Sequence, residues 1–198
     1  KINKIYDNST FFIHTNITNE KNIIDSFKYI KKKHKKVDIL INNAALNPKA
    51  KIIKKKYSNK LENFNLNNWQ KEIDVGLTGA FLCSKIFGYD MSKNKKGVII
   101  NISSDLGIIA PDQRIYKDLN EVKPVTYSVI KHGIIGLTKY IATYWGKDGV
   151  RANTLCPGGI YDNQPKKFVN KLKKLIPMNR MANVDEYKAS IQFLSSDA

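Results

Sequence analysis

The sequence contains little cysteine and no long apolar run, and each absence narrows the class of protein. Its two cysteines, Cys83 and Cys156, lie far apart in apolar segments, which argues against the disulfide framework of a small secreted domain. Neither they nor the three histidines show metal-ligand spacing, so no metal site is predicted. No stretch reaches the roughly 18 apolar residues of a membrane span, and residues 1–10 lack the apolar block of a signal peptide. We therefore expect a protein of the reducing cytoplasm with no membrane partner.

Arginine is also scarce, although the chain is strongly basic. The formal net charge is +17 over 198 residues, yet arginine occurs only at Arg114, Arg151 and Arg180. Specific readers of bases and phosphates favour the planar fork of arginine. The lysine runs at 31–36 and 54–56 therefore predict a solvated helix end and a solvated loop. A basic nucleic-acid-binding protein remains an alternative, but the prediction is that nucleic acid is not a partner.

Short apolar runs alternate with helical patterns along the chain. Strand character is found in four runs, at residues 11–14, 37–41, 98–102 and 151–155. Helical periodicity predicts three helices between them: one capped by Asn19 or Thr18 and running to about Lys33, one from near Leu66 past Ile86, and one after Pro124. This alternation predicts an α/β fold, a doubly wound parallel sheet flanked by helices. The length and the 42% hydrophobic content predict one domain over residues 1–198.

Polar residues follow three of the predicted strands. Asn42, Asn43 and Ala44 come after the second run, Ser103 and Ser104 after the third, and the segment 156–159, Cys-Pro-Gly-Gly, after the fourth. Ligands bind at the carboxyl ends of strands in sheets of this kind. Short side chains and bare backbone are therefore predicted to form a binding edge.

The spacing of Tyr127 and Lys131 indicates acid/base chemistry. Residues four apart leave the same face of a helix, and these two lie near the start of the third predicted helix. A phenol with an ordinary pKa of about 10 is a poor proton shuttle at neutral pH, but a nearby ammonium favours its ionised form. The pair alone would be weak evidence, because a helical tyrosine is usually a packing residue.

Together, Asn42-Asn43-Ala44, Asn101-x-Ser103-Ser104-x-x-Gly107, Tyr127-x-x-x-Lys131 and Pro157-Gly158-Gly159 resemble the short-chain dehydrogenase/reductase family, in order and in context. The resemblance implies a Rossmann-like fold and an NAD(P)-dependent enzyme that interconverts an alcohol and a carbonyl. By this resemblance Tyr127 is the general acid/base, and Lys131 lowers the pKa of Tyr127 and binds the nicotinamide ribose. Ser104 hydrogen-bonds the reacting oxygen. The residues that it assigns to the cofactor, NAD or NADP, are Asn16, Ile17, Asn43, Ala44, Tyr127, Lys131, Pro157, Gly158 and Ile160.

The sequence departs from the family pattern in three places. Gly76 stands where the family usually carries an asparagine that helps to hold a relay water, and the segment 111–123 lengthens the interval between serine and tyrosine. We expect this longer segment to edge the substrate site. The glycine-rich phosphate loop of the family is not found, and the resemblance begins just before the third strand and stops before the last. A fold that lacks the first βαβ unit and the last strand, as part of a longer protein, is therefore expected, and NAD cannot be told from NADP.

The substrate prediction depends on the long segment 111–123 and on residues 157–165. Both resemble a subgroup associated with modification of flagellin and surface glycans, which favours a sugar or sugar derivative. A 3-oxoacyl thioester reductase and a sugar-acid dehydrogenase remain open within the same family, as does a catalytically inactive binding subunit. The direction of the reaction is open as well. Relatives pair through the two long helices, so a homo-oligomer, dimer or tetramer, is expected.

Overall fold

A computed structural model describes residues 10–46, 59–119 and 122–197, and at its centre is a parallel sheet. Its strands are β1 (Ile39–Asn42), β2 (Gly97–Ile102) and β3 (Val150–Leu155), in the order β1-β2-β3. Three of the four predicted strands are thus confirmed, β1 lying slightly later in the chain than expected. Both strand pairs are parallel, which requires crossover connections and explains the intervening helices.

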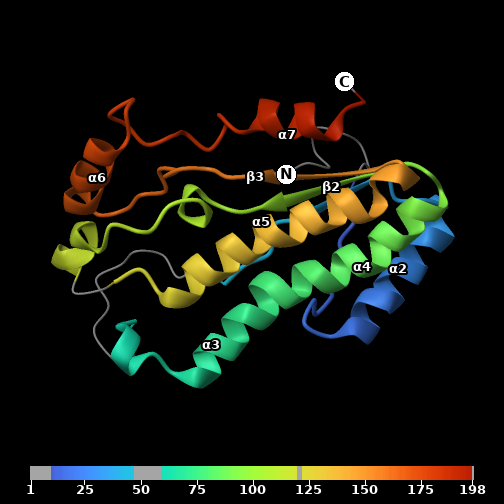
Figure 1. Cartoon of the computed structure of the whole chain (residues 1–198), viewed down its shortest axis with the longest axis horizontal. Coiled ribbons are helices and arrows are strands. Elements are labelled where there is room, and N and C mark those ends of the chain that lie inside the picture. The colour runs from blue at the N-terminus through green and yellow to red at the C-terminus, as the bar shows by residue number, and fades with distance from the viewer. Residues whose placement is uncertain (1–9, 47–58, 120–121, 198) are drawn as a thin grey trace.

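Helices cover both faces of this sheet (Figure 1). On one face α4 (Gly79–Lys93) packs against β1 and β2, and α5 (Val125–Trp145) packs against β2 and β3. On the other face α7 (Lys188–Ser195) contacts β2 and β3. α2 (Glu20–His34) packs against α4, on the same side of the sheet as α4 and α5. The α/β Rossmann-like fold predicted from the sequence is confirmed.

The remaining helices are short. α3 (Leu66–Ile73) is capped by Asn65 and leads through a π-helical turn, Asp74–Thr78, into α4. The others are α6 (Lys166–Leu172) and the 3₁₀ segments Leu61–Asn63, Asp105–Gly107, Gln113–Leu119, Gly146–Asp148 and Lys173–Leu175. The side chain of Asn19 accepts the backbone N–H of Asn22 at 3.1 Å, which confirms the predicted cap of α2.

The predicted strand at residues 11–14 is wrong. These residues have no regular secondary structure, and no other segment within the described ranges pairs with them. A strand forms only where neighbouring backbone takes up its hydrogen bonds. Phe11 instead packs on α2, with ring centroids 5.2 Å from His34 and 6.1 Å from Tyr29.

The core lies between β2 and the helices. Ile99, Met91, Ile141 and Val150 form one buried cluster, and Ile99 is fully enclosed. β2 is buried almost along its whole length, because it is the central strand and carries a helix on each face. This explains why its sequence shows a continuous apolar run rather than alternation.

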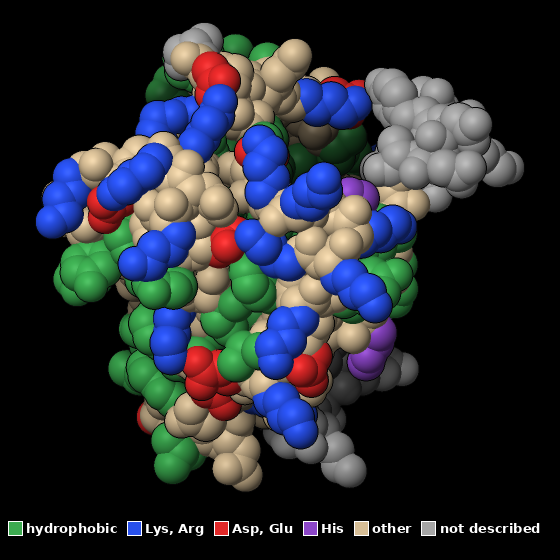
Figure 2. Space-filling model, turned by 90° about the vertical axis from the view of Figure 1, so that its right-hand side faces the viewer, with side chains coloured by type: hydrophobic (Ala, Val, Ile, Leu, Met, Phe, Trp, Pro, Cys, Tyr) green, Lys and Arg blue, Asp and Glu red, His purple; other side chains and the backbone are tan. Residues whose placement is uncertain are grey.

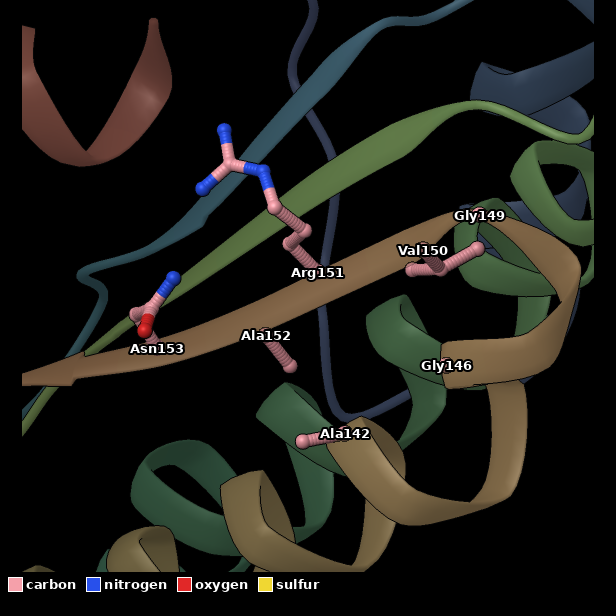
Figure 3. Close-up of a pocket in the computed structure, with 7 residues that line it drawn as sticks. All are labelled: Ala142, Gly146, Gly149, Val150, Arg151, Ala152 and Asn153. Atoms are coloured by element: carbon pink, nitrogen blue, oxygen red, sulfur yellow. The ribbon is translucent and has the colours of Figure 1, made fainter. Parts of the chain in front are cut away.

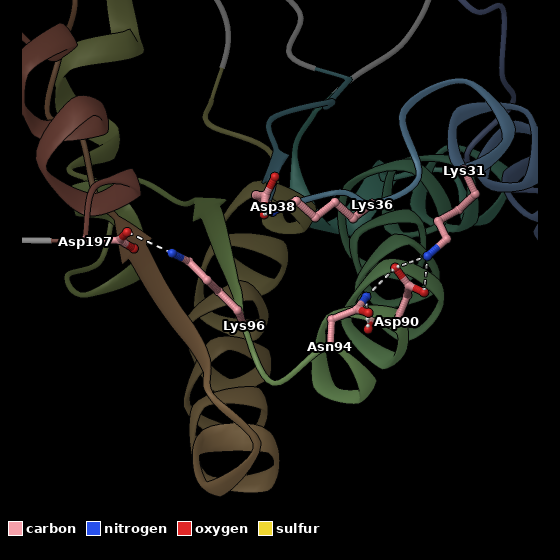
Figure 4. Close-up of polar contacts among 7 residues, drawn as sticks. All are labelled: Lys31, Lys36, Asp38, Asp90, Asn94, Lys96 and Asp197. Carbon is pink, nitrogen blue, oxygen red and sulfur yellow. Dashed lines mark hydrogen bonds and ion pairs between the residues drawn. The ribbon is translucent and has the colours of Figure 1, made fainter.

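Many of the lysines near this core are paired or solvated. Lys31 forms an ion pair with Asp90 at 2.8 Å, and Lys96 pairs with Asp197 at 2.8 Å (Figure 4). The run at 31–36 lies at the carboxyl end of α2, where positive charge is favoured by the helix dipole. Figure 2 shows lysine and arginine scattered over one face, with acidic and hydrophobic side chains between them. The run at 54–56 lies outside the described residues.

A groove runs along the outer edge of β3 (Figure 3). It is lined by Ala142, Gly146, Gly149, Val150, Arg151, Ala152 and Asn153 and has a volume of about 620 Å³. Arg151 also donates to the backbone carbonyls of Leu194 and Ser196, which ties α7 to the sheet. The groove lies near the end of α5, whereas Tyr127 lies near its start, roughly 20 Å away at 1.5 Å per residue. The groove is therefore separate from Tyr127.

No helix in the described ranges is long and apolar enough to span a membrane.

Candidate active site

The two adjacent serines after β2 have different surroundings. The hydroxyl of Ser103 donates to the backbone carbonyl of Lys131 at 2.7 Å and is buried against α5. The hydroxyl of Ser104 donates to the Asp105 carboxylate at 2.7 Å and accepts from the backbone N–H of Leu106 at 3.2 Å. Ser103 therefore fixes α5 to the strand end, while Ser104 caps the short 3₁₀ segment and lies beside Tyr127.

Tyr127 and Lys131 share one face of the first turns of α5, as their spacing predicts. The Lys131 ammonium lies 5.7 Å from the centroid of the Tyr127 ring and donates to the backbone carbonyl of Ile102 at 2.8 Å. This bond spans α5 and the end of β2. Ser104, Tyr127 and Lys131 are therefore brought together at the carboxyl end of the central strand.

Burial dominates the ionisation of this group. Desolvation raises the pKa of Tyr127 above its ordinary value, although a hydrogen bond with Ser104 acts in the opposite direction and the Asp105 charge adds to the increase. Burial also lowers the pKa of Lys131. Because desolvation is the largest of these effects, the neutral phenol is the resting form near neutral pH.

The segment after β3 lies against the same strand end. The carbonyl of Pro157 accepts the backbone N–H of Asp105 at 3.0 Å, and a Cβ added to Gly158 would lie 3.6 Å from Asp105 Oδ2. Gly158 donates its N–H to the Tyr187 hydroxyl at 3.1 Å. Ile160 pairs with Ala182 in a single parallel bridge. Pro157 and Gly158 therefore lie beside Asp105 at the end of β2, and contact of Pro157, Gly158 and Ile160 with the cofactor stays a prediction.

The other predicted cofactor residues lie at different places. Asn43 and Ala44 are exposed directly after β1. Asn16 accepts from the Thr18 backbone N–H at 3.0 Å and forms a turn before α2, and the side chain of Ile17 contacts α4 at Gly79. In the described part of the chain, no hydrogen bond, ion pair or ring contact joins them to Ser104, Tyr127 or Lys131.

Asn42 belongs to a buried polar network that aligns the strand ends. Its amide donates to the Asn101 side chain at 2.7 Å and to Ser84 at 3.0 Å, and Asn101 in turn donates to Thr138 on α5 at 2.8 Å. Asn101 is fully buried, and buried amides stabilise a fold only when they are paired. Asn42 and Asn101 thus hold β1, β2, α4 and α5 together beside the site.

The long segment before Tyr127 forms one wall of the site. Tyr116 is buried against Phe168 of α6, with ring centroids 5.2 Å apart, and it packs with Ile115 and Leu119. Burial together with the charges of Tyr127 and Asp105 raises its pKa, which places Tyr116 near both groups. The expectation that this segment edges the site agrees with these contacts. Asp105 and Lys123 were not singled out from the sequence as site residues.

Gly76 lies in the π-helical turn between α3 and α4. A Cβ at this position would lie 2.9 Å from Ile130 Cγ2 on α5, closer than real Cβ contacts allow. Ile130 therefore occupies the space that the asparagine side chain usual in relatives would need. π-turns within helices occur frequently at functional sites, and the glycine keeps the backbone carbonyl.

We predict that Gly76→Ala destabilises the protein by about 1–3 kcal/mol, because overpacking a buried site costs that much. Gly136→Ala on α5 is the matched control: nothing lies within 4 Å of the added Cβ, so the better helix former should stabilise by about 0.5–1 kcal/mol. Melting temperatures check both. The double variant Gly76→Ala/Ile130→Ala should lose less stability than the sum of the losses measured for Gly76→Ala and Ile130→Ala separately. Strict additivity would mean that Ile130 does not fill this space.

The chain is similar to known proteins over its whole length. All of residues 1–198 match the family described as Enoyl-(Acyl carrier protein) reductase. A 3-oxoacyl-[acyl-carrier-protein] reductase of Synechocystis sp. is 30% identical over 187 residues, 93% of this chain and 68% of that protein. The chain belongs to the short-chain dehydrogenase/reductase family. It is thus an NAD(P)-dependent oxidoreductase by family, of the kind that acts on CH–OH groups.

Other short-chain dehydrogenase/reductase relatives differ in what they act on. A short-chain dehydrogenase from Leptospira borgpetersenii, solved with bound NAD+, is 32% identical with a TM-score of 0.81 over 93% of this chain and 68% of that one. A 2-dehydro-3-deoxy-D-gluconate 5-dehydrogenase of Bacillus subtilis is 30% identical over 175 residues, 83% of this chain and 60% of the relative. Post-translational flagellin modification protein A of Campylobacter coli is 34% identical over 127 residues, 64% of this chain and 50% of the relative. The chain thus spans about two thirds or less of the length of these proteins.

Two donors at the strand ends fit a nicotinamide nucleotide. The Lys131 ammonium has three N–H groups, and Ile102 takes one of them. Within the described ranges no group accepts the N–H of Ile160. Ribose hydroxyls and a carboxamide are suitable acceptors for these donors, so the residues fit the nicotinamide half of the cofactor that the family uses.

Proposed function

We propose that this protein interconverts an alcohol and a carbonyl on a sugar or sugar derivative, with Tyr127 as general acid/base. Ser104 positions the reacting oxygen, and Lys131 binds the nicotinamide ribose and stabilises the ionised Tyr127. A bound NAD or NADP supplies the hydride acceptor or donor. Asn16, Ile17, Asn43 and Ala44 are proposed to line its adenosine side, and Pro157, Gly158 and Ile160 its nicotinamide side.

One observation supports this function above the others: Ser104, Tyr127 and Lys131 meet at the carboxyl end of β2. In reduction, the neutral phenol of Tyr127 donates its proton to the carbonyl oxygen as that oxygen gains negative charge. Ser104 and Tyr127 together hydrogen-bond the reacting oxygen, since the Ser104 hydroxyl can turn from Asp105 toward a ligand oxygen. The buried Lys131 charge then stabilises the phenolate left behind. In oxidation the same proton moves in the opposite direction.

The surroundings of Tyr127 favour a polar substrate. Asp105 and Lys123 both act electrostatically on the neighbourhood of Tyr127, and a long acyl chain would have to desolvate such charges. A hydroxylated sugar derivative can hydrogen-bond to them. The similarity to flagellin modification protein A and to a gluconate-type dehydrogenase supports the same substrate class.

A substrate panel tests this proposal. The purified protein is assayed with NAD and with NADP against polyols, keto sugars, sugar acids and a 3-oxoacyl thioester, and the absorbance of reduced nicotinamide is followed. We expect kcat/KM for at least one sugar derivative to exceed that for the thioester by about tenfold or more, because the unpaired polar groups of the site discriminate against an apolar chain. A preference for the thioester would assign the protein to acyl reduction instead.

We also propose that the protein forms a homo-oligomer, a dimer or a tetramer, through α4 and α5. These helices expose large aromatic side chains, Phe81 and Tyr89 on α4 and Tyr140 and Tyr144 on α5. Tyr140 and Tyr144 stack with ring centroids 5.5 Å apart. Aromatic residues are enriched at protein interfaces. Light scattering of the purified protein measures the state, and a monomer would contradict this assignment.

A further inference from the structure

A second lysine lies closer to Tyr127 than Lys131 does. The ammonium of Lys123 is 3.5 Å from the centroid of the Tyr127 ring, against 5.7 Å for Lys131. At this distance a cation is attracted by the ring face. Lys123 precedes Pro124, the residue before α5, so it reaches Tyr127 from the wall formed by the segment 111–123.

The backbone of Lys123 is fixed by a side chain of the same wall. Gln113 accepts the Lys123 N–H at 2.8 Å and donates its amide to the Lys123 carbonyl at 3.1 Å. Both polar groups of the Lys123 backbone are therefore held by one amide, at the start of the 3₁₀ segment Gln113–Leu119. The backbone from which this side chain extends is thereby fixed, which lowers the cost of ordering the residue on binding.

The two carboxylates that act on Lys123 are already engaged elsewhere. Asp105 accepts from Ser104 and from the backbone of Leu106, and Glu72 accepts from the Thr126 hydroxyl. Within the described part of the chain, no carboxylate forms an ion pair with Lys123. Its ammonium lies over the Tyr127 ring, on the side of the candidate active site.

The position is costly for a cation. Desolvation lowers the pKa of Lys123 to about 8; Lys131 contributes to the decrease, while Asp105 and Glu72 oppose it. Lys117, in the same wall, is exposed to solvent. Lysines in desolvating surroundings beside reacting atoms are found at functional sites, where the positive charge binds a ligand.

We propose that Lys123 determines substrate specificity by binding an anionic substituent, a carboxylate in the simplest case, on the sugar derivative whose carbonyl faces Tyr127. This inference rests on the proposed function and narrows its substrate class to acidic sugars. The reacting oxygen lies with Ser104 and Tyr127, and the carboxylate with Lys123. A hydroxyl in place of the carboxylate would leave the ammonium without a counter-charge.

A matched pair of ligands tests the proposal: D-gluconate and D-glucitol, which share a six-carbon polyol chain and differ in the carboxylate. Titration calorimetry in the presence of cofactor gives affinities, and steady-state assays give kcat and KM. The parent should bind gluconate roughly 10- to 100-fold more tightly than glucitol, the range for a charge-assisted hydrogen bond. Lys123→Met should remove this preference by weakening gluconate binding while changing glucitol affinity by less than about threefold, whereas Lys123→Arg should retain part of it.

Two controls separate the possible failures. Lys117→Met removes an exposed lysine from the same wall and should change neither affinity. Lys123→Met should melt at or above the parent temperature at pH 7, because the buried charge is gone, so loss of folding does not explain a loss of binding. Equal or absent affinity for the two ligands in the parent, or an equal fall in kcat for both in Lys123→Met, overturns the specificity role. If the parent binds gluconate more tightly than glucitol but turns over neither, the specificity role of Lys123 is supported and the proposed reaction is overturned.

Discussion

Tyr127→Phe is expected to lower turnover at least about a hundredfold while leaving cofactor affinity nearly unchanged. General acid/base catalysis contributes typically 10²–10⁴ in rate, and the hydroxyl is the only group that this substitution removes. The ring remains within reach of Lys123 and Lys131, so packing and both cation contacts are preserved. Steady-state kinetics and cofactor titration on the same preparation measure the two effects.

A small effect of Tyr127→Phe would contradict its role as the acid/base. Turnover within about threefold of the parent would show that another group carries the proton. Tyr116 is the nearest alternative phenol on electrostatic grounds, so Tyr116→Phe is the matched control. It removes one buried hydroxyl of the same kind and should change turnover by less than about tenfold.

Lys131→Met is expected to weaken cofactor binding and to slow the chemistry together. The variant keeps the apolar stem but removes the donors that we propose bind ribose, and loss of a charge-assisted hydrogen bond costs roughly 10- to 100-fold in affinity. Turnover should fall by at least about tenfold as well, since the phenolate loses its counter-charge. Calorimetric titration with NADH and NADPH measures the first effect, and saturating-cofactor kinetics the second.

A structural role alone predicts a different result for Lys131. The bond from its ammonium to the carbonyl of Ile102 ties α5 to β2, so its loss lowers the melting temperature whatever the catalytic role. If Lys131→Met melts earlier but keeps the parent affinity for both cofactors and its turnover, the residue only supports the fold.

Much of the fold and the central site were predictable because both depend on local patterns. The β2 run at 98–102 is apolar without alternation since a helix covers each face, and the helix after Pro124 has an apolar stripe that packs on the sheet. The four-residue spacing of Tyr127 and Lys131 survives folding because a helix fixes it. Strand ends in a parallel sheet meet at one edge, which brings Ser104 to the same place.

The remaining features depend on contacts that no local pattern encodes. Residues 11–14 have strand composition, but a strand needs a paired neighbour, and Phe11 packs on α2 instead. The contact of Lys123 with the Tyr127 ring accompanies hydrogen bonds between Gln113 and Lys123, which are ten residues apart. The raised pKa of Tyr127 arises from burial, which outweighs the effect that its spacing from Lys131 suggests.

Glycine at position 76 illustrates the same limit. The sequence shows that the usual asparagine of the family is absent, but it does not show what takes its place. The structure places Ile130 against the missing side chain and a π-turn around the glycine. Only the packing of α5 on α4 explains why a larger residue does not fit.

Transfer of labelled hydride tests the central claim most directly. The protein is incubated with nicotinamide cofactor that carries deuterium at its transferable position and with a keto sugar acid, and the product is analysed by mass spectrometry. The account predicts an alcohol that carries one deuterium on the former carbonyl carbon, formed at a rate that falls at least about a hundredfold in Tyr127→Phe. A product without deuterium at that carbon, or equal rates in parent and variant, would contradict it.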